Sequence, residues 1–283
     1  MPLQLDTEFS CNSVIWMTSL PENELGPTRR MVESVEALTN ETGIGFQHIH
    51  VSSAEHLKKL LCELINQASR HGMTPLLNFD MHGSKDHGLY IANTSEYVSW
   101  DVLSSCLQGL NQATGNNLAV IGAACFGLRA IMPVKLDKPA PFFVLLAPEE
   151  EVYVGFLEEN LPEFYRELFT FGSLDSAYNK YLSDEFKYFH CEKMLFIVVA
   201  KYIKAGCKGK SAQERCERLL TEVFAQGMEK TEDNLKTVRK KIKEGIRPTQ
   251  QLLDRYASVF LINRKCSFTM NELLDFLESH ENP

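Results

Sequence analysis

Five short apolar runs alternate with helical patterns through the first two thirds of the chain, and this alternation restricts the folds open to it. Each run is almost continuously apolar, which is typical of strands buried on both faces of a parallel sheet. Between the runs, apolar residues recur three and four positions apart, as in an amphipathic helix. The runs cover residues 13–17, 46–51, 75–81, 118–124 and 142–147. We therefore expect an α/β protein with three αβα layers and a mostly parallel sheet.

The pattern becomes helical only from about residue 188, which predicts a C-terminal helical extension. We place the boundary between an α/β domain of residues 1–205 and an extension of residues 206–283 that is a candidate for regulation. Capping boxes, in which a hydroxyl is followed three residues later by a glutamate, mark helix starts. They occur at Ser52-Ser53-Ala54-Glu55 and at Thr269-Met270-Asn271-Glu272. A further helix is expected to begin around Phe126.

The charge of the chain is negative overall but unevenly distributed. A net charge of −8 argues against general affinity for nucleic acids, so no nucleic-acid partner is expected. Residues 201–250 nevertheless contain 13 Lys plus Arg and 7 Asp plus Glu, a net +6. This basic segment fits a solvated helix face, or else a docking surface for an acidic partner or for the acidic remainder of the chain.

The sequence also bears on the compartment. No apolar run approaches the roughly 18 residues of a membrane span, so no membrane partner is expected. The N-terminus lacks the basic flank and apolar core of a signal peptide. The eight cysteines include no C-x-x-C pair. We therefore expect a cytoplasmic protein with reduced thiols.

Two of the apolar runs end in chemically capable residues next to glycine. The run 75–81 is followed by His82 and Gly83, and the run 118–124 is followed by Cys125. Parallel strands place their carboxyl ends at one edge of a sheet, where open α/β sheets bind ligands. A thiol beside an imidazole at this edge is the minimal equipment for covalent acyl transfer. We therefore predict that His82 and Cys125 form a catalytic dyad.

The backbone around these residues suits an oxyanion hole. Gly83 leaves room for a backbone N–H to approach a substrate. Cys125 is expected between a strand and a helix start, where its own N–H is free and the helix N-terminus favours the thiolate. The amides of Gly83 and Cys125 are therefore the predicted oxyanion donors.

The order of these elements resembles the caspase-like superfamily of cysteine peptidases. The resemblance covers residues 10–200 and is carried by Asp80-Met81-His82-Gly83-Ser84 and Ala124-Cys125-Phe126-Gly127. It is closer to CHAT-domain proteases than to caspases. A caspase cysteine is preceded by glutamine and alanine and followed by a small or polar residue, whereas these places hold Ala123, Ala124 and Phe126 here. The resemblance implies a caspase-like fold and an endopeptidase with no metal or organic cofactor, often controlled by a protein activator.

Acidic residues near the predicted strand ends are candidate substrate contacts. Asp80 and Glu149 are placed where a carboxylate could receive a basic residue on the acyl side of the scissile bond. Solvated loop charges explain the same residues equally well.

Three other interpretations remain open. Asp80, His82, Asp86 and His87 include residue types that ligate zinc, although their spacing fits no common metallohydrolase pattern. Residues 122–127 form a loosened version of a dinucleotide-binding turn, with Glu149 after the next strand. The third interpretation is a non-catalytic caspase-like interaction module that keeps both residues.

Overall fold

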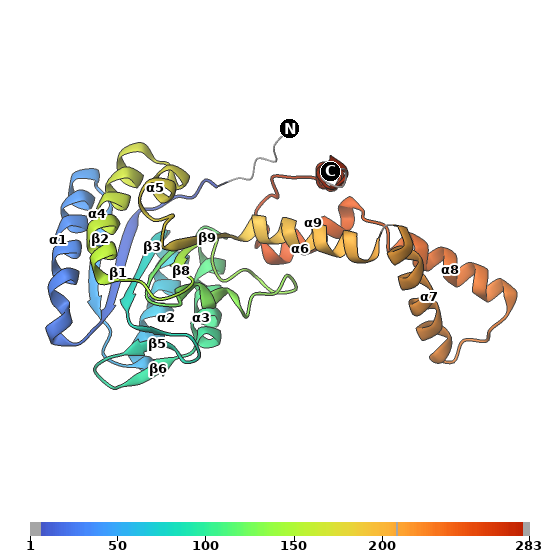
Figure 1. Ribbon diagram of the computed structural model, residues 1–283, viewed down its shortest axis with the longest axis horizontal. Coiled ribbons are helices and arrows are strands. Elements are labelled where there is room, and N and C mark those ends of the chain that lie inside the picture. Colours follow the sequence, from blue (N-terminus) through green and yellow to red (C-terminus); the bar gives the residue numbers. More distant parts are fainter. Residues whose placement is uncertain (1–6, 208, 280–283) are drawn as a thin grey trace. The chain divides into compact units, whose positions relative to one another are not determined.

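The protein, described here from a computed structural model, forms two compact units (Figure 1). The structure describes residues 7–207 and 209–279. Of the described residues, the first unit contains 7–191 together with the segment 259–264, and the second contains 192–207, 209–258 and 265–279.

A six-stranded sheet forms the centre of the first unit and confirms the predicted α/β class. Its strand order is β2-β1-β3-β7-β8-β9, with every pair parallel except β8 and β9. The residues of β1, β3, β7 and β8 are all buried, because helices cover both faces of the sheet. The strands are β1 (Ser13–Ser19), β2 (Gly45–His50), β3 (Pro75–Met81), β7 (Ala119–Ala123), β8 (Val144–Pro148) and β9 (Phe186–His190).

Helices on the two faces complete the three layers. The helices α1 (Leu25–Thr42) and α4 (Val154–Phe171) lie on one face, and α2 (Ala54–His71) and α3 (Trp100–Ala113) lie on the other (Figure 1). The amphipathic pattern explains this arrangement, since Leu57, Leu60, Leu61 and Leu64 of α2 are all buried. A shorter helix, α5 (Leu174–Tyr181), follows α4.

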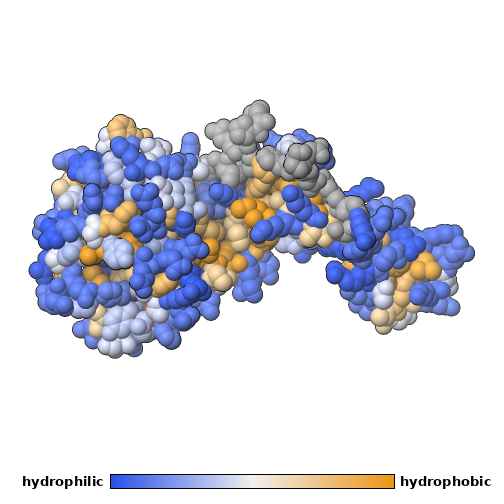
Figure 2. All heavy atoms as spheres, in the orientation of Figure 1, coloured by the Kyte–Doolittle hydropathy of each residue, from blue (hydrophilic) through white to orange (hydrophobic). Residues whose placement is uncertain are grey.

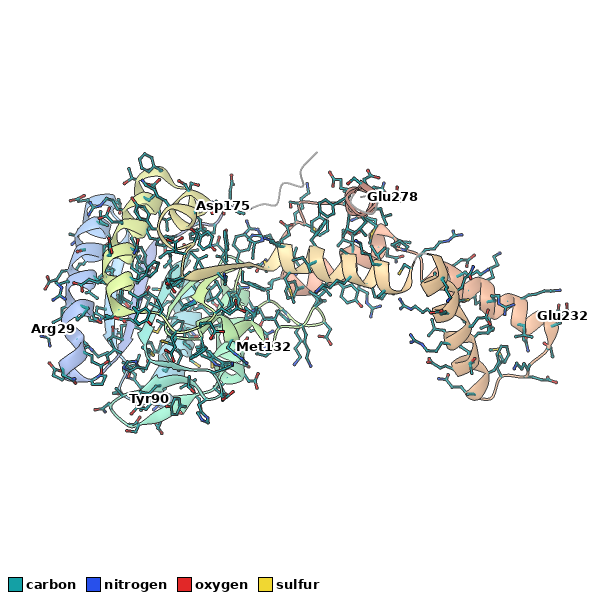
Figure 3. All side chains as sticks on the ribbon, in the orientation of Figure 1. Arg29, Tyr90, Met132, Asp175, Glu232 and Glu278 are labelled. Carbon is teal, nitrogen blue, oxygen red and sulfur yellow. The ribbon has the colours of Figure 1, made fainter. Side chains whose placement is uncertain are left out.

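A small antiparallel sheet follows β3 directly. It consists of β4 (Gly83–Ser84), β5 (Gly88–Ile91) and β6 (Glu96–Val98). The indole of Trp100, the first residue of α3, donates a hydrogen bond to the carbonyl of Ser84 at 3.1 Å. Tyr90, labelled in Figure 3, lies in the middle strand of this sheet and pairs with Tyr97 across it.

From Cys191 onward, the regular elements among the described residues are all helices. They are α6 (Cys191–Gly206), α7 (Gly209–Ala225), α8 (Glu232–Gly245), α9 (Gln250–Phe260) and α10 (Met270–Ser279). The ring of Phe196 packs edge-on against Phe268 and Phe276, with ring centroids 5.2 Å apart in both pairs. The predicted capping box of α10 is confirmed, since Thr269 and Glu272 exchange side-chain to backbone hydrogen bonds.

The capping box predicted for α2 differs by one residue from the structure. The N-cap is Ser53, whose hydroxyl accepts a hydrogen bond from the amide of His56 at 3.0 Å. Ser52 instead contacts the His56 ring through its own hydroxyl and amide. The sequence offers two adjacent serines for the cap, and the structure uses the second.

Strand β9 is missing from the sequence prediction, which expected only helices from about residue 188. Phe186 and Phe189 of β9 are buried, and the strand pairs antiparallel with β8. No turn residue separates these five residues from the apolar helix α6. Their apolar residues therefore read as part of the helical pattern. The open edge of β8, a tertiary feature, makes them a strand.

The two units also divide at a different place from the predicted boundary at 205. The first unit ends at Cys191, and the later segment 259–264 also belongs to it. In that segment, Phe260 accepts a backbone hydrogen bond from Ala140 at 2.9 Å. The Arg264 guanidinium lies 3.9 Å from the ring centre of Phe143 and donates to the carbonyls of Asn116 and Glu8.

Within the described ranges, none of the helices combines the length and the apolar character that a membrane span requires. Hydrophilic residues cover most of the face of the first unit that Figure 2 shows, with smaller apolar areas between them.

The edge strand β2 carries a histidine that predicts acid-sensitive stability. Burial, together with the neighbouring His50, lowers the pKa of His48 to about 4, and its ring bonds to the Thr18 hydroxyl at 3.0 Å. The unfolded chain therefore binds a proton that the folded chain does not between pH 6.5 and about 4. We expect the free energy of unfolding to fall as the pH falls through this window.

Urea unfolding at a series of pH values measures this effect. The loss should be about 1 kcal/mol, since solvent screens a half-buried ring. His48→Gln should flatten the pH dependence, whereas His71→Gln, at the exposed end of α2, should leave it as in the wild type. Identical slopes for His48→Gln and the wild type would contradict this assignment.

Candidate active site

The strand order reverses its direction at one point in the sheet, between β1 and β3. The chain moves outward from β1 to β2, and in the opposite direction from β3 through β7 to β8. Such a reversal leaves a crevice at the carboxyl ends of the strands, where open α/β sheets bind ligands. Glu24 follows β1 and His82 follows β3, so both lie at the carboxyl ends of the two strands where the order reverses. Cys125 follows β7, the next strand along.

The pairing of β3 with β7 brings the segments that carry His82 and Cys125 to the same edge of the sheet. The two strands are parallel neighbours, as the sequence predicted, and Asp80 pairs with Ala123. His82 follows the end of β3 by one residue, and Cys125 follows the end of β7 by two, in a turn. Asp80 bonds to Thr28 of α1, so the alternation of side chains along β3 places His82 on the face of the sheet that α1 and α4 cover.

The backbones of the two segments approach each other closely at Gly83. A β-carbon added to Gly83 would overlap the carbonyl oxygen of Cys125 and lie 3.2 Å from its amide nitrogen. No residue other than glycine fits this space without moving the chain. The glycine after the histidine therefore brings the two predicted site segments together.

The imidazole of His82 is held by a carboxylate that the sequence analysis did not identify. The Nε2 atom of His82 lies 2.7 Å from Oε2 of Glu24, the last residue of the short 3₁₀ helix η1 (Glu22–Glu24). The two side chains are 49% and 42% exposed. Glu24 was missed because it lies 58 residues upstream of His82, in a turn between Pro21 and α1 that carries no motif.

Asp80 lies on the same side of β3 as His82 but is part of the core. Its Oδ2 atom accepts hydrogen bonds from the Thr28 hydroxyl at 2.7 Å and from the Trp16 indole at 3.3 Å. Burial raises the pKa of Asp80, against the opposing effect of these donors and of His82. With 4% exposure, its carboxylate is closed to a substrate, which corrects the prediction of Asp80 as a substrate contact.

The Cys125 thiol lies in a sharp turn and is held by the loop after β8. The amide of Val152 donates to Sγ at 3.5 Å, and the thiol faces the Val152 carbonyl at 3.9 Å. The amide of Gly127 bonds to the carbonyl of Ala124 and closes a turn with Cys125 and Phe126 at its centre. Phe126 has a φ of 58°, a left-handed conformation that is strained by roughly 1 kcal/mol or more for a residue with a side chain.

The helix expected to begin at Phe126 is only the five-residue 3₁₀ helix η2 (Gly127–Ile131). Gly127 packs against the β-carbon of Ala147, and the chain then turns away toward β8. A single 3₁₀ turn has few aligned peptide dipoles, so the predicted favouring of a thiolate by a helix N-terminus does not apply.

The thiol and the imidazole form no hydrogen bond with each other among the described residues. Each has a different partner, Val152 for Cys125 and Glu24 for His82. The Nδ1 atom of His82 has no hydrogen-bond partner in the described part of the chain. A rotation about the Cys125 Cα–Cβ bond is the smallest change that redirects the sulfur, and such contacts commonly tighten only when a substrate binds.

The two amides predicted as oxyanion donors have different surroundings. The amide of Tyr90 donates to the carbonyl of His82 at 2.8 Å, which makes Gly83 and Leu89 a non-hydrogen-bonded pair of the β4–β5 ladder. The N–H of Gly83 therefore points away from β5. Outside the ladders, the described residues give neither the Gly83 nor the Cys125 amide an acceptor.

A hollow of about 210 Å³ lies beside the turn that carries Cys125. It contains Glu149, the other predicted substrate contact, which is exposed. It is lined by Leu128, Arg129, Ile131, Met132, Glu149 and Glu150. Met132, labelled in Figure 3, is 70% exposed. Tyr153, which precedes α4, and Val154, its first residue, are 78% and 54% exposed.

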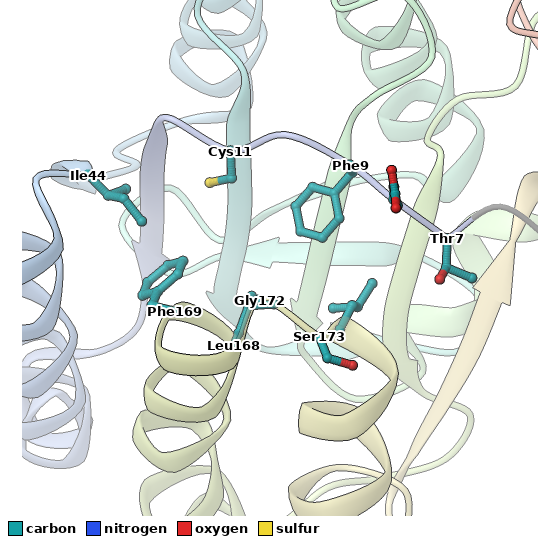
Figure 4. Close-up of a pocket in the computed structure, with 10 residues that line it drawn as sticks. Thr7, Phe9, Cys11, Ile44, Leu168, Phe169, Gly172 and Ser173 are labelled. Carbon is teal, nitrogen blue, oxygen red and sulfur yellow. The ribbon is translucent and has the colours of Figure 1, made fainter.

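A larger cavity of about 480 Å³ lies at the opposite edge of the sheet, near the start of β1 (Figure 4). Phe9, Ile44 and Phe169 contribute to its apolar lining, and Cys11 lies among them. The Cys11 thiol bonds to the Ser13 carbonyl at 3.3 Å, and burial raises its pKa. No histidine lines this cavity, so we do not assign it the chemistry of His82 and Cys125.

The glycines of the dinucleotide-like string have a structural explanation. Gly122 and Gly127, the glycines of the dinucleotide-like string, would each place a β-carbon 3.1 Å from the β-carbon of Ala147. Close packing against β8 therefore accounts for both. Among the described residues, no group of three or more His, Cys, Asp or Glu side chains is arranged to hold a metal ion.

No family model matches the chain, and no curated protein matches it either.

Proposed function

We propose that the chain is a cysteine endopeptidase that hydrolyses peptide bonds in protein substrates through Cys125 and His82. The supporting observation is the close approach of Gly83 to the backbone of Cys125, which joins the segments that follow two neighbouring parallel strands. The resemblance to caspase-like peptidases supports the same residues. The thiol requires a reducing compartment such as the cytoplasm, and all eight cysteines are free.

The proposed reaction follows the chemistry of a thiol and an imidazole. His82 accepts the thiol proton as the sulfur attacks the peptide carbonyl, and a C–S bond forms. The amides of Gly83 and Cys125 donate to the resulting oxyanion. His82 then gives its proton to the leaving amine as the C–N bond breaks, and later takes a proton from the water that hydrolyses the thioester.

Cleavage of unfolded proteins and peptide libraries tests this proposal. The full chain is incubated with the library, and the new termini are mapped by mass spectrometry. Cleavage by the wild type that is absent with Cys125→Ala supports the proposal. Cleavage that is equal for both proteins contradicts it.

The hollow beside Cys125 is the proposed site for a basic substrate residue. The aliphatic stem of a lysine or arginine fits against Ile131 and Met132, and its charged end pairs with Glu149. The exposed side chains of Tyr153 and Val154 give neighbouring apolar residues of the substrate a surface to contact.

Glu149→Gln is expected to lower kcat/KM by about 10-fold for substrates with a basic residue on the acyl side, since one charge-assisted hydrogen bond is weakened. The kcat/KM for substrates with an apolar residue there should not change. Glu151→Gln is the matched control, because Glu151 is exposed but does not line the hollow. An equal loss for both substrate classes would reject this specificity.

A non-catalytic interaction module is the second candidate function. It is favoured by the resting contacts, in which the thiol bonds to Val152 and the imidazole to Glu24. Alkylation with iodoacetamide separates the two candidates. A nucleophilic Cys125 should react faster than the exposed Cys62, whereas a structural thiol should not.

A further inference from the structure

The contact of Glu24 with His82 belongs to a pair of parallel links between α1 and β3. Glu24 and Thr28 lie one helical turn apart, and Asp80 and His82 lie two residues apart on one face of β3. Thr28 bonds to Asp80 at 2.7 Å and Glu24 bonds to His82 at 2.7 Å. The buried hydrogen bond between Thr28 and Asp80 fixes the start of α1 against β3. The exposed Glu24 carboxylate is therefore held at a defined position relative to His82.

The other acidic residue of η1, Glu22, does not bond to His82 but pairs with an arginine of α1. Glu22 forms an ion pair with Arg29 at 2.7 Å, and both side chains are well exposed. Of the two carboxylates in this turn, only Glu24 bonds to the imidazole. The chain therefore offers a matched control two residues away.

We propose that Glu24 is a positioning residue that sets the tautomer of His82, an inference that rests on the proposed peptidase function for its catalytic consequence. An ionised carboxylate can only accept hydrogen bonds, so Nε2 of the neutral ring must carry the proton. The lone pair is then on Nδ1, which is the nitrogen without a hydrogen-bond partner among the described residues. Nδ1 is the atom that accepts the proton of Cys125.

The proton balance follows from this assignment. As the sulfur attacks, its S–H bond breaks and an Nδ1–H bond forms, which leaves a cationic ring. The Glu24 carboxylate stabilises this cation through the Nε2–H hydrogen bond. The same Nδ1 proton then passes to the leaving amine, and Glu24 remains ionised throughout.

Glu24→Gln tests the proposal because the amide is nearly the same size but can donate a hydrogen bond. A donated bond to Nε2 favours the other tautomer, with the proton on Nδ1, where it blocks acceptance from the thiol. We expect kcat to fall by about 10- to 100-fold with KM nearly unchanged, less than for a buried triad carboxylate because solvent reaches this pair. Glu24→Asp should recover part of kcat, and Glu22→Gln should behave as the wild type.

Nitrogen-15 NMR of histidine-labelled protein reads the tautomer directly, with His82 assigned by loss of its signals in His82→Gln. The wild type should show an Nε2–H tautomer, and Glu24→Gln should shift the population toward Nδ1–H. An Nδ1–H tautomer in the wild type, or the same tautomer in both proteins, would overturn the proposal. An effect of Glu22→Gln equal to that of Glu24→Gln would also overturn it.

The two readouts separate this inference from the proposed function. If the wild type cleaves no peptide, the proposed function fails, while the tautomer still decides whether Glu24 sets the state of the ring. If cleavage occurs and Glu24→Gln changes neither kcat nor the tautomer, the proposed function stands and the role of Glu24 is rejected. Equal Tm values for Glu24→Gln and the wild type establish that the fold is intact, as the 42% exposure of Glu24 leads us to expect.

Discussion

Replacing Cys125 with alanine is expected to reduce peptide-bond cleavage by at least about 10³-fold, because alanine has no sulfur to form the proposed thioester. The fold should be unchanged, since the partly exposed thiol makes only weak contacts with Val152. His82→Ala should cause a loss of the same order, because the two residues act as one unit. The measurement is the rate of cleavage of a mapped peptide, with Tm as the check on folding.

Cys62→Ala is the matched control for Cys125→Ala. Cys62 is an exposed free thiol on α2, away from the strand ends, so its removal should leave the rate as in the wild type. Double replacement of Cys125 and His82 should be no worse than either single change. Substantial cleavage by Cys125→Ala would reject the dyad, whatever the other variants do.

The second large effect is expected at Gly83, where Gly83→Ala should destabilise the protein by about 1–3 kcal/mol. The added β-carbon would overlap the Cys125 carbonyl oxygen. Because the overlapping atom belongs to the backbone, no side-chain rotation can relieve the conflict, and one of the two strand ends must move. Any folded protein should also cleave about 10²-fold more slowly, since a displacement of about 1 Å is enough for such a loss.

Gly155→Ala is the control for Gly83→Ala. Gly155 lies in the first turn of α4, and nothing lies within 4 Å of a β-carbon added there. Alanine is the better helix former, so this change should be neutral or stabilising. Urea unfolding compares the two variants independently of any enzymatic activity. A Gly83→Ala protein as stable as the wild type would show that the two strand ends do not meet as described.

Most of the central sheet could be predicted from sequence because its strands carry their own signal. The run 75–81 coincides with β3, and the run 118–124 includes β7, since strands buried on both faces must be continuously apolar. Their parallel pairing follows from the helices between them. The placement of His82 and Cys125 at one edge was therefore predictable.

The strand β9 and the segment 259–264 could not be predicted in the same way. Each is short and joins a helical pattern without a break. Each is defined by a partner distant in sequence, the edge of β8 for the first and Ala140 for the second. The periodicity of a sequence shows how apolar and polar residues alternate within a segment. It does not show which sheet edge or loop elsewhere in the fold has unpaired backbone groups for that segment to bond to.

The sequence by itself determined the three-layer α/β class and which residue types stand at the ends of β3 and β7. Those properties depend on local periodicity and on chain order. Only the tertiary structure decided that Asp80 is enclosed by Thr28 and Trp16, that Glu24 bonds to His82, and that Val152 holds the Cys125 thiol. These contacts join segments between 27 and 64 residues apart, and the docking of helices and loops on the sheet, rather than any local pattern, brings their atoms within reach.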